Sequence, residues 1–237
     1  MSEGCSNYTE GVGHTIVDCQ DPVSRASGLA RAQQALRAGE IIVMPTDTVY
    51  GVACDAFSAD AVALLLASKG RGRHMPPPVL VGSPADAEAL ALSIPEGSKA
   101  VMEAFWPGGV TIIVKANPSV VWDLGETAGT VALRMPDNEI ALELLHASGP
   151  LAVSSANKTG QQSAHSVEEA VVQLGDSVSV YLDGGVVGGL DTQGSANPGS
   201  TIIDATALDT GGPWRVVRYG VVPVDSLKAV AKGEWEL

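Results

Sequence analysis

Two polar clusters in this sequence contain groups that could bind an anionic small molecule. The first is the segment 44–51, Met-Pro-Thr-Asp-Thr-Val-Tyr-Gly, which follows the apolar run 41–43. It places two hydroxyls (Thr46 and Thr48), a carboxylate and the Tyr50 phenol on one turn. Open α/β sheets bind ligands at strand ends that carry such groups, although the same residues could simply satisfy the backbone of a tight turn.

The second cluster is basic and lies in residues 69–74, Lys-Gly-Arg-Gly-Arg-His, within a chain of net charge -13. A cation in the last turn of a helix is favoured by the helix dipole, which accounts for Lys69 but not for Arg71 and Arg73 in the loop that follows. Arginine offers a planar fork of donors that fits a phosphate, and lysine a point charge. We therefore favour phosphate binding over a solvated charged surface.

Polar side chains also flank several other expected strands. They are Arg134 at the end of strand 130–134, Ser154, Ser155 and Asn157 after strand 151–153, Ser200 before strand 201–204, and Arg218 at the end of strand 214–218. Each could be explained alone by a surface salt bridge or a local turn. Together they predict a pocket of hydroxyl and guanidinium groups that suits a small anionic ligand.

Several common catalytic and cofactor motifs do not occur in the sequence. There is no Gly-x4-Gly-Lys-Ser/Thr phosphate loop, no Gly-x-Gly-x-x-Gly dinucleotide turn and no Gly-x-Ser-x-Gly nucleophile elbow. No His/Cys cluster offers a zinc site, so we expect no metal held by the protein. No side chain stands out as a covalent nucleophile or a general base, and the sequence therefore assigns no catalytic residue.

Composition limits the class of protein. A chain of 237 residues that is 45% hydrophobic fits one globular domain. Its apolar runs are far shorter than the ~18 residues of a membrane span, so we expect no membrane association. The first residues lack the basic and apolar parts of a secretory signal, and three unpaired cysteines indicate a reduced, cytoplasmic protein. The net charge argues against broad electrostatic binding of nucleic acid.

Hydrophobic periodicity and capping residues predict the elements that position the polar groups. Helices are expected over 25–38 after Ser24, from Ser58 or Asp60 to Lys69, twice between Pro84 and Phe105, from Asp137 or Asn138 to about 147, over 167–174 after a Ser166-x-x-Glu169 capping box, and over 225–230. Strands are expected at 40–44, 78–81, 110–115, 130–134, 151–153, 179–182, 201–204 and 214–218. This order predicts an α/β sheet covered by helices on both faces.

The domain organisation follows from the same pattern. We expect residues 1–14 to form a flexible tail and residues 15–237 a single domain. The Gly-rich segment 184–199 is too long for a hairpin turn and leads into Ser200. We therefore expect a flap that is mobile when the pocket is empty and ordered over a bound ligand.

Six motifs, in order over about 25–222, resemble the YrdC-like threonylcarbamoyl-AMP synthase family. They are Pro-Thr-Asp-Thr-Val-Tyr-Gly at 45–51, Lys-Gly-Arg at 69–71, Arg-Met-Pro at 134–136, Ser-Ser-Ala-Asn at 154–157, Ser-Thr-Ile-Ile-Asp at 200–204 and Arg-Tyr-Gly at 218–220. The resemblance implies a twisted, mixed β-sheet with helices on both faces around a deep central cavity. It also implies the short, single-domain form of the family.

The resemblance implies a nucleotidyltransferase that makes L-threonylcarbamoyladenylate and pyrophosphate from L-threonine, bicarbonate or CO2, and ATP with Mg²⁺. The threonine carbamate would attack the α-phosphorus of ATP in line, and pyrophosphate would leave. The product would serve N6-threonylcarbamoyladenosine modification of tRNA through a downstream threonylcarbamoyl-transferase machinery. Direct binding of tRNA or double-stranded RNA is compatible with this role.

The matching motifs imply roles for individual residues. The residues expected to bind threonine are Thr46, Thr48, Tyr50, Arg134 and Ser200, and those expected to bind ATP are Lys69, Arg71, Thr130, Ser155, Asn157, Ser163 and Arg218. Two departures from the family pattern occur between these motifs. Gly72 stands where the family usually has proline, and Pro76-Pro77-Pro78 stands where it usually has Pro-Leu. We therefore expect the loop 72–78 to follow a path of its own.

Two other functions are compatible with the same residues. A binding module could hold double-stranded RNA or tRNA in the basic cavity without chemistry, although the net charge of -13 weakens this reading. A sugar-phosphate lyase of the riboflavin pathway would need clustered acidic metal ligands, which Asp47 and Asp55 alone do not supply.

Overall fold

The computed structural model describes residues 8–10, 13–188 and 198–237. The expected N-terminal tail therefore lies outside the described residues at 1–7 and 11–12, while Tyr8–Glu10 within it forms strand β1. The expected flap over 184–199 lies outside them at 189–197.

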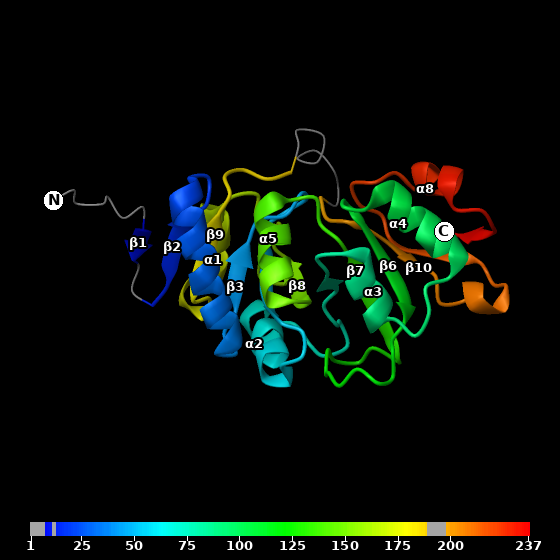
Figure 1. Ribbon diagram of the computed structural model, residues 1–237, viewed down its shortest axis with the longest axis horizontal. Helices are drawn as coiled ribbons and strands as arrows, with labels where there is room; N and C mark the ends of the chain where they lie inside the picture. The colour runs from blue at the N-terminus through cyan, green and yellow to red at the C-terminus, as the bar shows by residue number, and fades with distance from the viewer. Residues whose placement is uncertain (1–7, 11–12, 189–197) are drawn as a thin grey trace.

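The described residues form one mixed sheet, and Figure 1 shows its helices packed along it. The strands are β1 Tyr8–Glu10, β2 Thr15–Asp18, β3 Ile42–Met44, β4 Gly51–Asp55, β5 Val79–Leu80, β6 Val110–Lys115, β7 Thr130–Arg134, β8 Leu151–Ser155, β9 Val180–Asp183, β10 Thr201–Asp204, β11 Trp214–Arg218 and β12 Trp235–Glu236. Their order across the sheet is β1-β2-β9-β3-β4-β8-β5-β7-β6-β10-β11-β12. The sheet contains parallel pairs such as β2–β9 and β6–β10 and antiparallel pairs such as β4–β8 and β6–β7.

The helices are α1 Pro22–Arg37, α2 Ala59–Lys69, α3 Pro84–Leu90, α4 Glu96–Phe105, α5 Glu139–Ser148, α6 Val167–Leu174 and α8 Val224–Val230, with short 3-10 turns at Gly175–Ser177 and Leu208–Thr210. Within the described ranges, no helix has both the length and the apolar character needed to cross a membrane.

Side-chain alternation along the strands explains why helices cover both faces of the first half of the sheet. In β3, Ile42 and Met44 pack in the buried cluster of α1 and α5, whereas Val43 lies in the cluster that contains α2 and α6. Successive side chains of a strand point to opposite faces, so a buried strand of three apolar residues needs a layer on each side. The predicted α/β sheet with helices on both faces is confirmed.

The second half of the sheet uses its two faces differently. In β6, Val110, Ile112 and Val114 are buried in the cluster that includes α3 and α4. The intervening Thr111 and Ile113 point to the other face, which forms the wall of a cavity. In this half, helices therefore cover one face of the sheet, and the other face lines the cavity.

Most predicted helix starts are confirmed, and one is wrong by three residues. Ser166 caps α6 as predicted, and of the alternatives that the sequence left open, Ser58 caps α2 and Asn138 caps α5. Helix α1 instead begins at Pro22, because the Asp21 carboxylate accepts a hydrogen bond from the Ser24 backbone N–H at 2.9 Å and proline fits the first helical position.

Strand β4 is the missed element that matters most for the site. Gly51–Asp55 pairs antiparallel with both β3 and β8, so residues 45–50 form the connection between two neighbouring strands. The polar turn before it and the short apolar run Val52-Ala53-Cys54 gave no clear strand pattern in the sequence. Its presence holds the Thr46–Tyr50 turn in the middle of the sheet. Strand β2 was also missed, and it pairs in parallel with β9.

Candidate active site

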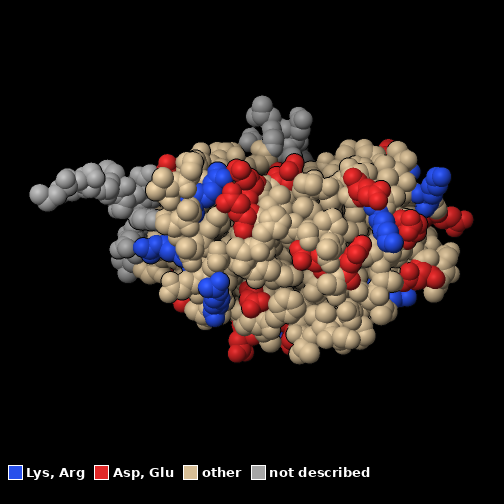
Figure 2. Space-filling view, in the orientation of Figure 1, with Lys and Arg blue, Asp and Glu red and all other residues tan. Residues whose placement is uncertain are grey.

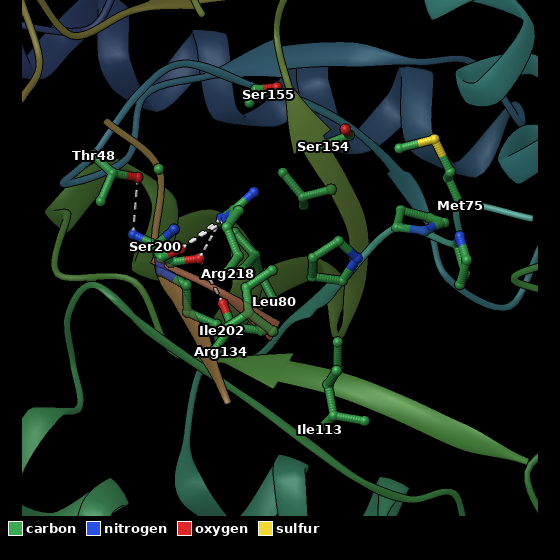
Figure 3. A pocket seen from close by; sticks show the side chains of 18 of the residues that line it. Thr48, Met75, Leu80, Ile113, Arg134, Ser154, Ser155, Ser200, Ile202 and Arg218 are labelled. Atoms are coloured by element: carbon green, nitrogen blue, oxygen red, sulfur yellow. Dashed lines mark hydrogen bonds between the residues drawn. The ribbon is translucent and has the colours of Figure 1, made fainter. Parts of the chain in front are cut away.

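A cavity of about 340 Å³ lies between the two halves of the sheet. The turn 46–51 and the end of β8 form one side, and strands β6, β7, β10 and β11 form the other. The loop 75–78 closes a third side. Figure 3 shows Thr48, Arg134, Ser200 and Arg218 grouped at one end of this cavity and Met75 at the other. The cavity therefore has one polar and one largely apolar end.

The turn after β3 is held in shape by the hydroxyl of Thr46. That hydroxyl donates to the Val49 carbonyl oxygen at 2.6 Å and accepts from the Thr48 backbone N–H at 3.2 Å. The Thr48 hydroxyl lies 3.1 Å from it and also accepts from the Arg134 guanidinium at 3.1 Å. Thr46 thus shapes the turn, and Thr48 presents its hydroxyl beside a buried cation.

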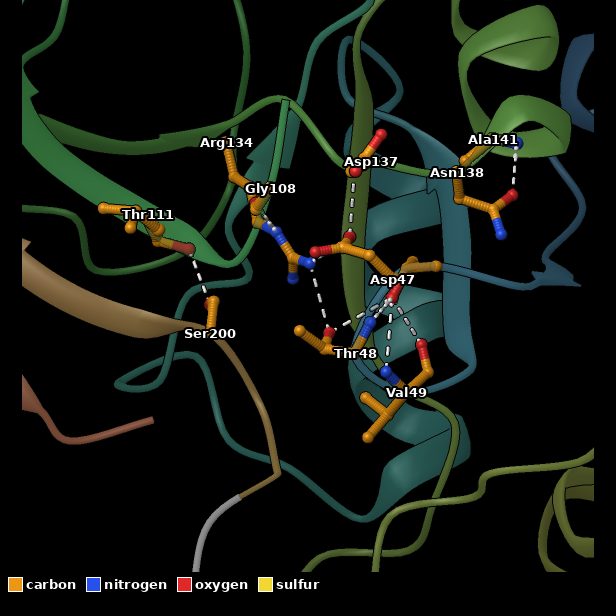
Figure 4. A network of polar contacts seen from close by, with 12 residues as sticks. Asp47, Thr48, Val49, Gly108, Thr111, Arg134, Asp137, Asn138, Ala141 and Ser200 are labelled. Atoms are coloured by element: carbon orange, nitrogen blue, oxygen red, sulfur yellow. Dashed lines mark hydrogen bonds and ion pairs between the residues drawn. The ribbon is translucent and has the colours of Figure 1, made fainter. Parts of the chain in front are cut away.

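The guanidinium of Arg134 is fixed by three acceptors, as Figure 4 shows. Its Nη2 donates to Asp47 Oδ1 at 2.5 Å and to Thr48, and its Nε donates to the Gly108 carbonyl oxygen at 3.0 Å. Asp47 Oδ1 also accepts from the Asp137 backbone N–H at 3.1 Å. Sequence reasoning missed this role of Asp47, although a carboxylate in the same turn as Thr48 was a visible signal.

We predict that Asp47→Asn lowers the free energy of unfolding by about 2 kcal/mol, because a hydrogen bond to a charged group contributes about 1.5–3 kcal/mol. The side chains of Arg134 and Asp47 are only 8% and 17% exposed, so water has little access to replace the lost hydrogen bond. Urea unfolding measures this change. A variant as stable as the parent would show that Asp47 does not stabilise Arg134.

Arg218 and Ser200 form a second fixed group at the polar end. Arg218 donates from Nε and Nη2 to the Ser200 carbonyl oxygen at 3.0 and 2.7 Å, and from Nη2 to the Ser200 hydroxyl at 3.0 Å. The Ser200 hydroxyl lies 2.7 Å from that of Thr111. Burial, together with the nearby Arg134 and Arg71, lowers the pKa of Arg218 to about 10. The three guanidinium groups repel one another, and an anion bound in the cavity would reduce this repulsion.

Arg71 has an unused donor. Its Nη1 donates to the Ser154 hydroxyl at 2.9 Å, but its Nε is buried and has no hydrogen-bond partner in the part of the chain that the structure describes. Burial also lowers the pKa of this guanidinium. A buried donor without an acceptor is costly, and such a group at a cavity wall is a candidate ligand contact.

Lys69 lies behind the cavity wall rather than in it. Its ammonium donates to the carbonyl oxygens of Ser155 and Asn157, the second at 2.6 Å, and lies 3.4 Å from Asn157 Oδ1. The side chain of Asn157 in turn donates to the carbonyl oxygens of Lys158 and Gln161. Burial and the neighbouring Arg71 and Lys158 lower the pKa of Lys69 to about 7. Lys69 therefore holds the segment after β8 against the end of α2.

This shift predicts a pH dependence of stability. Because the pKa of Lys69 falls from 10.5 to about 7 on folding, the unfolded chain binds more protons between these values, and Lys69 contributes more stability as pH rises. The loss of unfolding free energy caused by Lys69→Met should therefore be larger at pH 9 than at pH 7. Urea unfolding of both proteins at the two pH values measures it, and a pH-independent difference would contradict it.

The structure brings together ten of the twelve site residues that the sequence suggested. The ten that line the cavity are Thr46, Thr48, Tyr50, Arg71, Thr130, Arg134, Ser155, Ser163, Ser200 and Arg218, and the two behind the wall are Lys69 and Asn157. The Tyr50 hydroxyl donates to the Gly185 carbonyl oxygen at 2.6 Å. The Thr130 hydroxyl donates to the Thr127 carbonyl oxygen at 2.8 Å. These two hydroxyls are thus already engaged within the protein.

Some other lining residues were given no binding role by the sequence. They include Thr111, whose hydroxyl lies beside that of Ser200, and the apolar Leu80 and Leu124. Side-chain alternation along β6 places Thr111 on the face opposite Val110, but the sequence alone does not show that this face meets the end of β8.

The charge of the cavity is opposite to that of the whole chain. Among the described residues that line it, three carry a guanidinium and none is Asp, Glu, His or Lys. The described residues also contain no group of three or more His, Cys, Asp or Glu side chains arranged to hold a metal ion. The arrangement therefore suits an anionic ligand that supplies its own negative charge.

Comparisons with known proteins identify relatives of this chain. The family model for Sua5, YciO and YrdC, described as telomere recombination, matches residues 34–220. A Mycobacterium tuberculosis protein, named provisionally as a threonylcarbamoyl-AMP synthase, is 47% identical over 213 residues, which cover 90% of this chain and 93% of that protein. The threonylcarbamoyl-AMP synthase of Bacillus subtilis is 37% identical over 177 residues, which cover 73% of this chain and 51% of that protein.

A solved structure gives the same result for the fold. The crystal structure of Sua5 from P. abyssi in complex with L-threonine superposes with a TM-score of 0.82 at 28% identity. The match covers 93% of this chain and 62% of that chain, so this chain spans about six tenths of the archaeal protein. The family model covers well over half of the sequence, and the chain belongs to the Sua5/YciO/YrdC family.

Proposed function

We propose that this protein is a threonylcarbamoyl-AMP synthase, which forms L-threonylcarbamoyladenylate and pyrophosphate from L-threonine, bicarbonate and ATP. Relatives up to 47% identical are named for this activity. The structural observation that carries the proposal is the convergence of Arg71, Arg134 and Arg218 on one cavity with the hydroxyls of Thr48 and Ser200. Both the carboxylate of threonine and the phosphates of ATP need such donors.

Threonine is assigned to the polar end of the cavity. Arg134, fixed by Asp47 and Gly108, is the proposed partner of its carboxylate. The hydroxyls of Thr48 and Ser200 are the proposed contacts of its polar groups, with Thr46 and Tyr50 shaping the wall. The archaeal Sua5 structure with bound L-threonine supports a threonine site in this fold.

ATP is assigned to the rest of the cavity. Arg71 and Arg218 are the proposed phosphate contacts, since one has an unpaired buried donor and the other is surrounded by like charge. Thr130, Ser155 and Ser163 line the same region. Lys69 and Asn157 contribute by holding the segment after β8 in place. The apolar end at Met75, Pro76 and Leu124 fits a nucleobase.

The proposed reaction needs no nucleophile from the protein. The ammonium of threonine first loses a proton, and the neutral amine then adds to bicarbonate with loss of water, which gives a carbamate. A carbamate oxygen then attacks the α-phosphorus of ATP, the bond to the β-phosphate oxygen breaks, and pyrophosphate leaves with the electron pair. Arginines around the cavity would stabilise the charge on the reacting phosphate, and the fixed geometry would bring the two anions together.

Mg²⁺ is proposed to enter with ATP rather than to occupy a site of the protein. Mg²⁺ prefers carboxylate and phosphate oxygens, and the described lining residues include no carboxylate. The residues present therefore do not fit a resident magnesium ion, whereas the triphosphate offers the oxygens that it needs.

We further propose that the product passes to a tRNA threonylcarbamoyl-transferase machinery in the cytoplasm. A binding module for tRNA or double-stranded RNA is the less favoured function. The net charge is -13, and the face seen in Figure 2 mixes acidic with basic side chains and shows no continuous basic field.

The proposal is tested by pyrophosphate release from reactions in which one substrate at a time is omitted. We expect release to require ATP, L-threonine and bicarbonate together. Release that is unchanged without threonine or without bicarbonate would assign the cavity to a different nucleotide reaction.

A further inference from the structure

Two loops that line the cavity meet at its apolar end. The first, residues 70–78, joins α2 to β5 and supplies Arg71 and the Met75–Pro78 wall. The second, residues 116–129, joins β6 to β7 and supplies Leu124 and Thr127. The first loop is also where the sequence departs from its family. The question is what holds these loops together.

Arg73 joins the two loops through its side chain and its backbone. Its Nη2 lies 2.8 and 3.0 Å from the two carboxylate oxygens of Asp123. Its carbonyl oxygen accepts from the Glu126 backbone N–H at 2.9 Å. These contacts between Arg73 and residues 123–126 are called the clasp below. Neither Arg73 nor Asp123 lines the cavity.

The second loop is shaped to receive Arg73. Asp123 Oδ1 also accepts from the Gly125 backbone N–H at 3.0 Å, which turns the chain at this point. Gly125 has a φ of +107°, and a Cβ there would lie 2.6 Å from the Arg73 carbonyl oxygen. Only glycine permits both this backbone conformation and this close approach. Leu124, between the two contact residues, is 2% exposed and lines the cavity.

The hydrogen bonds also favour the charged form of Asp123. Donation from Arg73 and from Gly125 lowers the pKa of Asp123. On the far side of Asp123, Trp122 stacks on Phe57 with ring centroids 5.9 Å apart. The second loop is therefore anchored to the start of α2 as well as to Arg73.

We propose that Arg73 and Asp123 are positioning residues that set the affinity for ATP, by holding the loop of Arg71 and Pro76-Pro77 against Leu124 and Thr127. The inference rests on the proposed function. It states that the Arg73–Asp123 ion pair sets the width of the cavity at the end where the nucleotide is proposed to bind. The proposed threonine contact Arg134 is held by Asp47 and Gly108, which do not belong to the clasp. The proposed threonine site therefore does not depend on the clasp. Loss of the clasp should thus raise the KM for ATP without changing the KM for threonine.

The test compares Arg73→Gln, Asp123→Asn and the double variant in steady-state assays of pyrophosphate release. Each single change should raise KM for ATP about threefold to fivefold, since the two side chains are half exposed and such pairs are modest in strength. KM for threonine should stay unchanged. The double variant should be no worse than either single variant, because both remove the same contact.

Two further variants separate positioning from a general effect on stability. Arg73→Lys keeps the charge and should restore part of the affinity for ATP. Glu139→Gln removes a carboxylate that lies 2.8 Å from Arg25 and does not line the cavity, and it should leave both KM values unchanged. Melting temperatures should be similar across the set.

The outcomes distinguish this inference from the proposed function. If the parent protein releases pyrophosphate with all three substrates but the clasp variants show an unchanged KM for ATP, the positioning role is wrong while the activity stands. Additive effects of the two single changes, or equal effects on both KM values, would also overturn it. A parent protein without activity would overturn the proposed function itself, and binding of ATP by calorimetry would then still test the clasp.

Discussion

Replacing Arg71 by alanine is expected to lower kcat/KM for ATP by about a hundredfold or more. Removal of one preorganised donor to a developing charge commonly costs about 10²–10³ in rate. The buried Nε of the Arg71 guanidinium has no hydrogen-bond partner among the described residues, so this donor is available for a phosphate. Steady-state kinetics of pyrophosphate release measures the loss.

The same substitution should leave the empty protein at least as stable as the parent. Burial lowers the pKa of Arg71, and its charge lies near Lys69 and Arg218, so its removal relieves repulsion. A large loss of activity together with an unchanged or higher melting temperature would identify a ligand contact. Near-normal activity of Arg71→Ala, with a more damaging Arg73→Gln, would contradict the assigned register of the basic loop.

Threonine is expected to support the reaction at least a thousandfold better than valine. The two amino acids have the same shape, but valine leaves the hydroxyl contacts of the pocket unmatched. Sites built to bind a hydroxyl reject the analogue that lacks it by about 10⁴–10⁵, because buried polar groups then lose their partner. Thr48 and Ser200 are buried, and we propose that their hydroxyls supply such contacts. Serine, which keeps the hydroxyl, should be used less well than threonine but better than valine.

The measurement is kcat/KM for the three amino acids at saturating ATP and bicarbonate. Thr48→Val is the matched variant, since it removes one hydroxyl and keeps the volume of the side chain. It should reduce the preference for threonine over valine. Equal turnover of valine and threonine by the parent protein would contradict a hydroxyl-specific site.

The sequence predicted most of the regular elements because their signals are local. Capping residues such as Ser58 and Asn138 and the alternation in β6 mark elements within a few residues of themselves. Strand β4 was missed because its three apolar residues follow a polar turn, and its identity depends on pairing with β3 and β8. Pairing between distant strands leaves little trace in a single sequence.

The site was predicted as a set of residue types, whereas its internal contacts were not. Polar groups at strand ends indicated an anion pocket, and the ordered motifs indicated the family. The sequence did not show that Asp47 fixes Arg134 or that Lys69 turns away from the cavity to the carbonyl oxygens of residues 155 and 157. Both contacts join residues more than eighty positions apart, and only the folded sheet brings them together.

The central claim is that this cavity joins threonine, bicarbonate and the AMP part of ATP in one molecule. Incubation of the protein with ¹³C-labelled bicarbonate, ATP, Mg²⁺ and L-threonine, followed by rapid mass spectrometry, tests it directly. We predict a threonylcarbamoyladenylate that carries one ¹³C atom, formed together with pyrophosphate. Conversion of ATP without incorporation of the label into an adenylate, or an unlabelled threonyl-adenylate, would contradict the account.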